Sequence, residues 1–335
     1  MYMKYPFLME DLLSSEWPFS GVSLVISIIG GLILVALLFK RSYSTVKDPS
    51  LCDSPNCVRC RQSKESDQVI TNTLKERCLQ YITKYRCAAA NPNQVLAEEY
   101  PRILDAISSL ADKPNILASV YEFSGYKLSN ETQHPHIWTV PDLTRRPFWN
   151  PHTIVQIKSI FTTAVFNRVL EDYKTVNSTE QGWKLNNTPT GKWRIYPIFN
   201  QGNKVVDNCV NCSDTVRIVE SIQTFMHGCV YGNTMFSVLH SNSVIEPHTG
   251  PCNFRLRCHL PLIAPSGFKV RVATETREWT RGELLVFDDS CVHSVWYEGA
   301  GSGVEPRVVL ILDIWHPELR TNEIDMLRHC YSDSF

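Results

Sequence analysis

The stretch His248–Leu262, HTGPCNFRLRCHLPL, decides how the rest of the chain is interpreted. A histidine opens it on a Thr-Gly-Pro turn, and an alternating run follows. Because successive side chains of a strand point to opposite faces, one face carries Phe254, Leu256, Cys258 and Leu260, and the other carries Arg255, Arg257 and His259. Buried cationic groups are costly unless an anion meets them. The run therefore predicts either a solvated face, where arginine usually lies, or an interior that receives an anion.

Two later stretches favour the second alternative. Arg281–Trp296, RGELLVFDDSCVHSVW, predicts an apolar strand that ends in an Asp-Asp-Ser turn and then presents His293. Arg307–Leu319, RVVLILDIWHPEL, begins with an arginine ahead of an unbroken apolar run. A bidentate carboxylate is the best partner for an arginine at the mouth of a buried strand. Two separated histidines and two interior arginines indicate a metal beside an anionic co-substrate.

These residues resemble those of the aspartyl/asparaginyl β-hydroxylases, a branch of the Fe(II)- and 2-oxoglutarate-dependent oxygenases. The resemblance covers Pro141–Leu319 and rests on five motifs in order, which are PFW at Pro147, HTGP at His248, RLRCHL at Arg255, FDDS at Phe287 and HPEL at His316. It implies a double-stranded β-helix, a jelly roll of the cupin type. The many short strands and regular turns of this region agree with that fold, so we expect a mainly β domain with flanking helices.

The resemblance implies that His248 and His293 bind the iron. The acidic residue that usually stands two positions after the first histidine is replaced by Gly250, as in the family, so water would complete the coordination sphere. Asp288 or Asp289 is an alternative third ligand. The resemblance instead implies that these two residues shape the turn and orient His293 by accepting a hydrogen bond.

The co-substrate implied by the resemblance is 2-oxoglutarate. Its keto acid end would meet the RLRCHL strand, where we assign Arg257, Cys258 and His259 to the binding site. Its distal carboxylate would be held by Arg307 together with Ser237. The cofactor would supply the difficult oxidation, while the protein positions and shields it.

The motifs do not assign a role to one tryptophan and three histidines. Trp193 matches a tryptophan at the edge of the family's co-substrate pocket, although an alternating strand residue of this kind is equally often part of the core. Three further histidines have no motif partner and are expected to be structural, namely His227, His240 and His316.

Three functions remain open. The leading hypothesis is an active dioxygenase that uses 2-oxoglutarate and O2 to hydroxylate a protein or peptide side chain. A membrane-anchored pseudoenzyme or binding module is the second, and the retained motif residues count against it. Hydroxylation of a lipid is the third, because related bacterial members act on acyl chains. The net charge of −1 argues against nucleic-acid binding.

The chain of 335 residues is predicted to be anchored once in a membrane. Gly21–Phe39 is uncharged and long enough for a membrane helix. A cleaved signal peptide is disfavoured, because the apolar run is too long and Lys40-Arg41 follows in place of a small-residue cleavage site. We expect a tail over 1–20, the transmembrane helix over 21–39, a linker over 40–65, a helical region over 66–140 and the dioxygenase domain over 141–335.

Orientation signals disagree. Basic residues after the span predict a cytosolic domain by the positive-inside rule. Four glycosylation tripeptides, at Asn130, Asn177, Asn186 and Asn211, predict a lumenal one. The resembled hydroxylase is a type II protein of the secretory-pathway lumen, and we prefer that interpretation.

Local patterns add further expectations. Cys52, Cys57 and Cys60 could begin a zinc site that lacks a fourth ligand, be acylated, or form disulfides. Cys209 and Cys212 bracket a loop that carries a disulfide in the hydroxylase, but the loop is shorter here. Helices are expected over Ser66–Ala111, broken into two at Asn91-Pro92-Asn93, and over Thr153–Tyr173 and Thr215–Met226.

Overall fold

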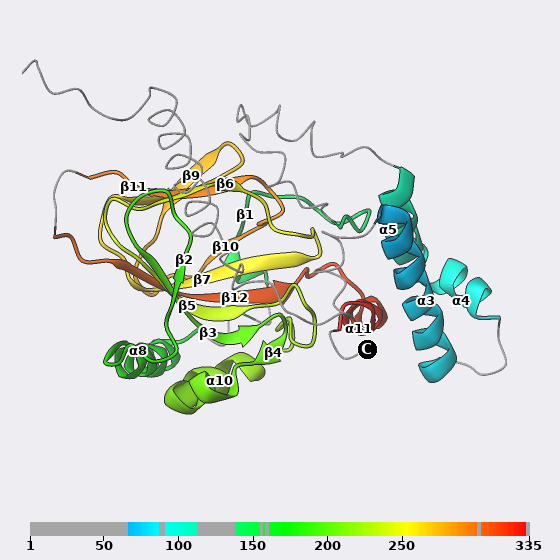
Figure 1. Cartoon of the computed structure of the whole chain (residues 1–335), viewed down its shortest axis with the longest axis horizontal. Coiled ribbons are helices and arrows are strands. Elements are labelled where there is room, and N and C mark those ends of the chain that lie inside the picture. Colours follow the sequence, from blue (N-terminus) through cyan, green and yellow to red (C-terminus); the bar gives the residue numbers. More distant parts are fainter. Residues whose placement is uncertain are drawn as a thin grey trace, which may run out of the picture. The chain divides into compact units, whose positions relative to one another are not determined.

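Two antiparallel β-sheets form the centre of the protein (Figure 1). The computed structural model describes residues 66–86, 91–112, 138–154, 157, 161–299 and 303–332. The predicted membrane helix, the linker cysteines and the tripeptide at Asn130 lie outside these ranges. None of the helices within them combines the length and apolarity needed to cross a membrane.

The larger sheet runs in the order β1-β10-β7-β12-β5-β3-β2, and a short strand, β4, pairs with β3. Its strands are β1 (Phe148–Trp149), β2 (Lys184–Asn186), β3 (Trp193–Asn200), β4 (Asn203–Lys204), β5 (Thr234–Leu239), β7 (Arg255–Ile263), β10 (Leu285–Phe287) and β12 (Arg307–Trp315). The smaller sheet runs in the order β6-β11-β8-β9. It comprises β6 (Val244–His248), β8 (Phe268–Val272), β9 (Glu275–Glu278) and β11 (His293–Tyr297). This arrangement is the jelly roll that the alternating stretches predicted.

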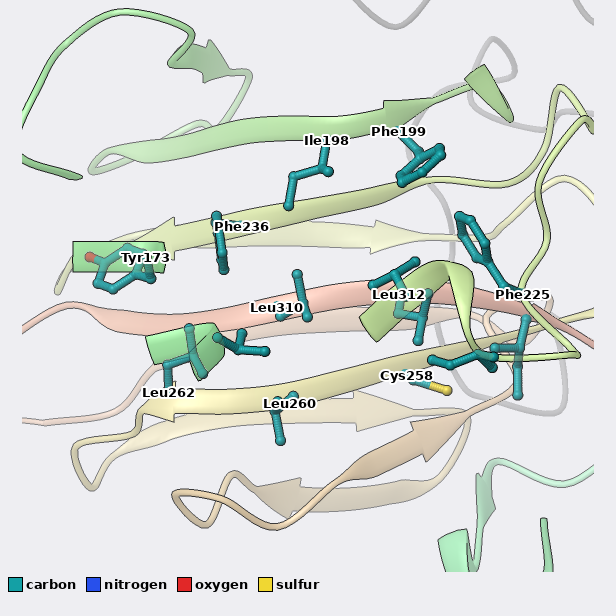
Figure 2. Packing of buried hydrophobic residues seen from close by; sticks show 14 of the residues in the cluster. Tyr173, Ile198, Phe199, Phe225, Phe236, Cys258, Leu260, Leu262, Leu310 and Leu312 are labelled. Carbon is teal, nitrogen blue, oxygen red and sulfur yellow. The ribbon is translucent and has the colours of Figure 1, made fainter. Parts of the chain in front are cut away.

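The two faces of the larger sheet bury different side chains. On β7 and β12 one set of alternating residues joins a cluster beneath the sheet, which includes Leu256, Cys258, Leu260, Leu310 and Leu312 (Figure 2). The other set faces the smaller sheet, where Val309 and Ile311 pack with residues of β8 and β11. The predicted alternation of His248–Leu262 is therefore confirmed, and its cationic face lies between the two sheets.

Helices α8 (Thr163–Asn177) and α10 (Ser213–Glu220) cover the outer face of the larger sheet (Figure 1). The predicted start of the first helix at Thr153 is wrong. The helix begins at Thr163 because the hydroxyl of Thr162 accepts a hydrogen bond from the Val165 amide, which caps the N-terminus. Pro151–Thr153 forms the short 3₁₀ helix η2 instead. The second predicted helix ends six residues early, at Glu220.

Within residues 66–86 and 91–112, the described part of the helical region, there are three helices where two were predicted. They are α3 (Asp67–Tyr85), α4 (Pro92–Glu99) and α5 (Pro101–Asp112). Pro101 has no amide hydrogen and restricts the preceding Tyr100, so the second helix stops there. These helices share a hydrophobic cluster with α11 (Thr321–Cys330) and with Trp315 of β12. The division predicted at residues 140 and 141 stays a prediction.

The cysteines of the α9–η3 turn do not form a disulfide. Cys209 ends α9 (Val206–Cys209) and Cys212 ends η3 (Val210–Cys212), and both are free thiols. Each sulfur donates to a backbone carbonyl, Cys209 to Ile198 at 3.4 Å and Cys212 to Asn208 at 3.3 Å.

Candidate functional site

The structure brings the two predicted metal-binding histidines together. His248 is the last residue of β6 and His293 the first of β11, and the two are register partners across the ladder. Their ring centroids lie 4.1 Å apart. Nδ1 of His248 lies 2.8 Å from the Glu246 carbonyl, and Nδ1 of His293 lies 2.9 Å from the Cys291 carbonyl.

Those carbonyls determine the tautomer of both rings. A carbonyl oxygen only accepts, so each Nδ1 carries a hydrogen and each Nε2 keeps its lone pair. Burial lowers the pKa of His248 and lowers that of His293 well below its ordinary value. The neutral imidazole, which is the form that binds a metal, is therefore favoured in both.

Gly250 has no room for the missing acidic ligand. A Cβ at this position would lie 2.5 Å from Oδ2 of Asp289, and the Gly250 amide donates to the Asp289 carbonyl at 2.6 Å. The carboxylate of Asp289 thus fills the space beside the histidines. Across the described part of the chain, no group of three or more His, Cys, Asp and Glu side chains is placed to hold a metal ion.

Two buried aspartates neutralise two of the arginines. Asp289 accepts from Nε of Arg255 at 3.2 Å and also from its Nη2. Asp313 accepts from Nε and Nη2 of Arg257 at 2.9 and 3.0 Å. A cross-contact of 3.4 Å joins Arg257 to Asp289. The four side chains form one charge-balanced network, here called the Arg–Asp network.

The contacts of the two neighbouring aspartates correct one expectation. Asp289 binds arginine rather than His293, and Asp288 accepts from the Ser290 amide and hydroxyl at 2.9 and 2.6 Å. Neither aspartate orients the histidine, whose Nδ1 partner is a carbonyl. Asp313 holds the Arg257 guanidinium in a bidentate pair, and the predicted contact of Arg257 with the keto acid end of the co-substrate stays a prediction.

Arg307 differs from both of these arginines because the structure gives it no counter-ion. It is 1% exposed, and among the described residues no carboxylate pairs with it. Its Nη2 donates to the Ser237 hydroxyl at 3.1 Å, its guanidinium lies 4.7 Å above the Trp279 ring, and its Nε has no hydrogen-bond partner. Burial alone lowers its pKa to about 9.

Ser237 connects Arg307 to Trp193. The indole Nε1 of Trp193 donates to the Ser237 hydroxyl at 3.1 Å. Trp193 and Arg307 belong to the two strands that flank β5, and both are register partners of Leu239. Because the serine oxygen accepts from both neighbours, its own hydrogen is available for a third group. The pair expected to act together, Ser237 and Arg307, is thus in contact, and Trp193 joins it through the serine hydroxyl.

His259 presents a second unsatisfied donor on the same face. Its Nδ1 accepts from Nε1 of Trp279 at 3.2 Å, so Nε2 carries the hydrogen of the neutral ring, and that atom has no partner within the described residues. Burial lowers the pKa of His259 well below its ordinary value, with Arg307 and Arg257 adding to the effect. Neutral His259 is therefore a fixed hydrogen-bond donor.

Phe287, His259 and Trp279 make a series of ring contacts between the histidine pair and Arg307. The Phe287 ring lies 5.5 Å from His293 and 5.1 Å from His259. Trp279 then stacks on His259 with ring centroids 5.9 Å apart. The guanidinium carbon of Arg307 lies 4.7 Å from the centroid of the same Trp279 ring. A series of ring contacts therefore connects the paired imidazoles to the Arg307 guanidinium on the inner face of the larger sheet.

The assignment of Cys258 to the binding site is wrong for its side chain. Strand alternation directs it into the cluster beneath the larger sheet, away from the cationic face (Figure 2). Burial raises the pKa of this thiol well above its ordinary value. Its contribution is to packing.

Two residues of the site, Trp279 and Asp313, were not among the candidates, and Asp313 was counted within an apolar run. Asp313 did carry a signal, because it is the one charged residue inside that run and it lies an even number of positions from Arg307, on the same strand face. Trp279 carried none, since its position depends on how the turn after β9 folds back.

Comparisons with known proteins agree with this geometry. The sequence model of the family described as Aspartyl/Asparaginyl beta-hydroxylase matches residues 163–317. Human aspartate beta-hydroxylase domain-containing protein 2 is 32% identical over 278 residues, which cover 81% of this chain and 68% of that protein. Mouse aspartyl/asparaginyl beta-hydroxylase is 29% identical over 238 residues, which cover 63% of this chain and 29% of that protein.

A solved structure described as an oxidoreductase of the 2OG-Fe(II) oxygenase family, from Burkholderia pseudomallei, is also similar. It is 13% identical, covers 46% of this chain and 81% of its own, and has a TM-score of 0.31.

Proposed function

Because this chain belongs to the aspartyl/asparaginyl β-hydroxylase family, we propose that it is an Fe(II)- and 2-oxoglutarate-dependent dioxygenase that hydroxylates a side chain of a protein or peptide. His248 and His293 would hold the iron through their Nε2 atoms. The metal would supply the oxygen chemistry, and the described residues would bind and orient the co-substrate and exclude water.

One observation carries the proposal, namely the unsatisfied donors of the interior face. Nε of Arg307 and Nε2 of His259 are buried and unpartnered, and the Ser237 hydroxyl has a hydrogen to give. Burying such donors without acceptors costs about 1–3 kcal/mol each, and more for a charged group. A dicarboxylate offers acceptors only, so it satisfies the donors and neutralises the guanidinium together.

The histidine pair supports iron as the metal. Two neutral imidazoles of fixed tautomer leave most coordination positions open to a chelating co-substrate and water, which an oxygen-activating iron requires. The crowding of Gly250 against Asp289 leaves no space for a carboxylate at that position.

Metal analysis and turnover test the proposal together. We expect the protein, purified without oxygen, to bind one iron and to convert 2-oxoglutarate to succinate when given its substrate. His248→Ala should lose the iron, whereas His227→Ala, at an exposed histidine outside the site, should retain it. Unchanged iron in His248→Ala would refute the ligand assignment.

Turnover separates the enzyme from a binding module. Because the substrate is unknown, membranes from cells with and without the protein should be compared by mass spectrometry for peptides that gain one oxygen. Loaded iron and tight 2-oxoglutarate binding, with no succinate and no oxygenated peptide, would favour the pseudoenzyme. Oxygenated lipids without oxygenated peptides would favour a lipid substrate.

We further propose that the catalytic domain lies in the secretory-pathway lumen, anchored by Gly21–Phe39. Among the described acceptor sites, Asn177 and Asn211 have exposed side chains, as glycosylation requires. A mass decrease on glycosidase treatment is expected. An unchanged mass, together with cleavage by a cytosolic protease, would place the domain on the other side.

A further inference from the structure

Two buried thiols, far apart in the sequence, meet between the helical region and the end of the chain. Cys78 on α3 and Cys330 on α11 are 0% and 1% exposed, and their sulfurs lie 3.2 Å apart. A disulfide bond is about 2.05 Å long, so a closure of about 1 Å would join them. The residues of this pair take no part in the proposed iron or co-substrate site.

The backbone beside the pair is held in register. The guanidinium of Arg77, the neighbour of Cys78, donates to the Cys330 carbonyl at 2.7 Å. Around the sulfurs, α3 and α11 contribute Leu74, Ile82 and Leu327 to one hydrophobic cluster. The two thiols are therefore kept in contact by their surroundings and do not meet by chance rotation of exposed side chains.

We propose that Cys78 and Cys330 form a disulfide that fastens α3 to α11. The two thiols lose two protons and two electrons as the S–S bond forms. A disulfide of a thiol–disulfide oxidoreductase, or oxidised glutathione, accepts them and becomes two thiols. The bond belongs to an oxidising compartment, and it does not depend on whether the protein binds iron.

In the folded protein Cys330 is a poor nucleophile, and both sulfurs are buried away from an oxidant, which sets the time of oxidation. Burial raises the pKa of the Cys330 thiol well above its ordinary value, and exchange requires a thiolate. Oxidation therefore takes place while α11 is docking, when the thiols are still accessible. Once α11 is in place, the same burial protects the bond from reduction.

Other cysteines of the same cluster provide an internal control. Cys229 and Cys252 are also buried there, but among the described residues Cys78 and Cys330 form the thiol pair whose sulfurs are in contact. A specific disulfide therefore predicts one linkage, whereas random oxidation of a crowded core would produce several.

Peptide mapping tests the proposal on the full chain. Cells that express it are lysed in N-ethylmaleimide, and the protein is digested with trypsin without reduction. Cleavage after Arg77 and Arg328 yields CLQYITK (78–84) and HCYSDSF (329–335), each with a single cysteine. We expect these two peptides joined as the main species, and separated after dithiothreitol treatment.

Two variants and a melting measurement complete the design. Cys78→Ser should leave Cys330 alkylated, and Cys258→Ser, in the other cluster, should leave the link intact. Because the bond closes a loop of about 250 residues, reduction with dithiothreitol in urea, followed by refolding in the reductant, should lower the Tm of the wild type by about 5–10 °C, and that of Cys78→Ser hardly at all. Recovery of both wild-type peptides as maleimide adducts, or linkage of Cys330 to Cys229 or Cys252, would overturn the proposal.

Discussion

Buried arginines occur at two places on the inner face of the larger sheet, and they differ in their counter-charge. In the Arg–Asp network, Arg255 and Arg257 face Asp289 and Asp313, and the buried charges sum to zero. At the other end of β12, Arg307 faces a serine hydroxyl and an indole ring. The network is complete without a ligand, whereas Arg307 is not.

The difference separates a structural charge from a binding charge. Burial opposes the ionisation of Arg255, but Asp289 and Asp313 overcome it and raise its pKa, while burial acts unopposed on Arg307 and lowers its pKa to about 9. A folded protein retains such an uncompensated cation at a cost in stability. Binding of an anion recovers that cost, and so the same residue type stabilises the fold in one place and recruits a ligand in the other.

The largest expected effect comes from breaking the network. Arg255→Met should lower the free energy of unfolding by about 3–5 kcal/mol, because it leaves the buried Asp289 with only its 3.4 Å contact to Arg257, which is already paired with Asp313. Urea unfolding measures the change. The double variant Arg255→Met/Asp289→Asn, which removes both charges, should recover most of the loss. If the single and double variants were equally unstable, lost packing rather than unpaired charge would be responsible.

Removal of Arg307 should affect ligand binding and leave the stability of the fold nearly unchanged. Arg307→Met should leave the free energy of unfolding unchanged or slightly higher, since it removes a buried charge that has no partner. It should weaken 2-oxoglutarate binding about 100-fold, the effect of losing a buried charged hydrogen-bond partner. Calorimetric titration and urea unfolding of the same preparation measure both. A loss of stability as large as that of Arg255→Met would show that the two arginines do not differ in kind.

The sequence predicted the parts of this comparison that depend on local alternation. Strand periodicity placed Arg255, Arg257 and His259 on one face, and they belong to the observed strand β7. The contact of the Arg307 guanidinium with the Ser237 hydroxyl agrees with the role expected for this pair, whereas Trp193 had been left open between the site and the core. The resemblance to a family supplied the roles, since periodicity alone left a solvated face equally open.

What could not be predicted depends on register between distant strands. Asp313 meets Arg257 because β7 and β12 pair with those two residues opposite each other, although 56 positions separate them. Which arginine is neutralised is decided by that register and not by any local pattern. The end of α4 at Tyr100-Pro101 was missed for another reason. The proline is visible in the sequence, but the helical spacing of the apolar residues around it favoured one continuous helix.

The neighbouring aspartates repeat the comparison with the sign of the charge reversed. Burial alone would raise the pKa of Asp289, but Arg255 and Arg257 overcome it and lower that pKa. Burial raises the pKa of Asp288 to about 6, and the hydrogen bonds from Ser290 offset only part of the effect. When the pKa of a carboxyl is higher in the folded state than its ordinary value of about 4, protonation of that carboxyl stabilises the folded protein.

Asp288→Asn should therefore change how stability depends on pH. The contribution of Asp288 is fully present below about pH 4 and is lost as the pH rises through 6. The variant lacks this loss, so its free energy of unfolding should match that of the wild type at pH 4 and exceed it by about 2–3 kcal/mol at pH 7. Urea unfolding at the two pH values gives the difference. An advantage of the variant at pH 4 that disappears at pH 7 would reverse the assigned sign.

The smallest expected effect concerns the support of Arg307 rather than its charge. Trp193→Phe removes the indole donor to Ser237 and retains an aromatic ring at the edge of the site. Freed of one donor, the serine hydroxyl can rotate, and its hydrogen is no longer directed toward the bound carboxylate. Loss of one neutral hydrogen bond is worth about 1 kcal/mol, so 2-oxoglutarate should bind about 5-fold more weakly, with stability nearly unchanged.

Ser237→Ala provides the matched control for this last prediction. It removes the shared acceptor, so adding Trp193→Phe to it should weaken binding no further, because the indole then has no partner to lose. Independent, additive effects of the two substitutions would mean that the tryptophan acts by direct contact with the ligand. In that case the donor chain from Trp193 through Ser237 would not be what orients the carboxylate, and Arg307 alone would carry the recognition.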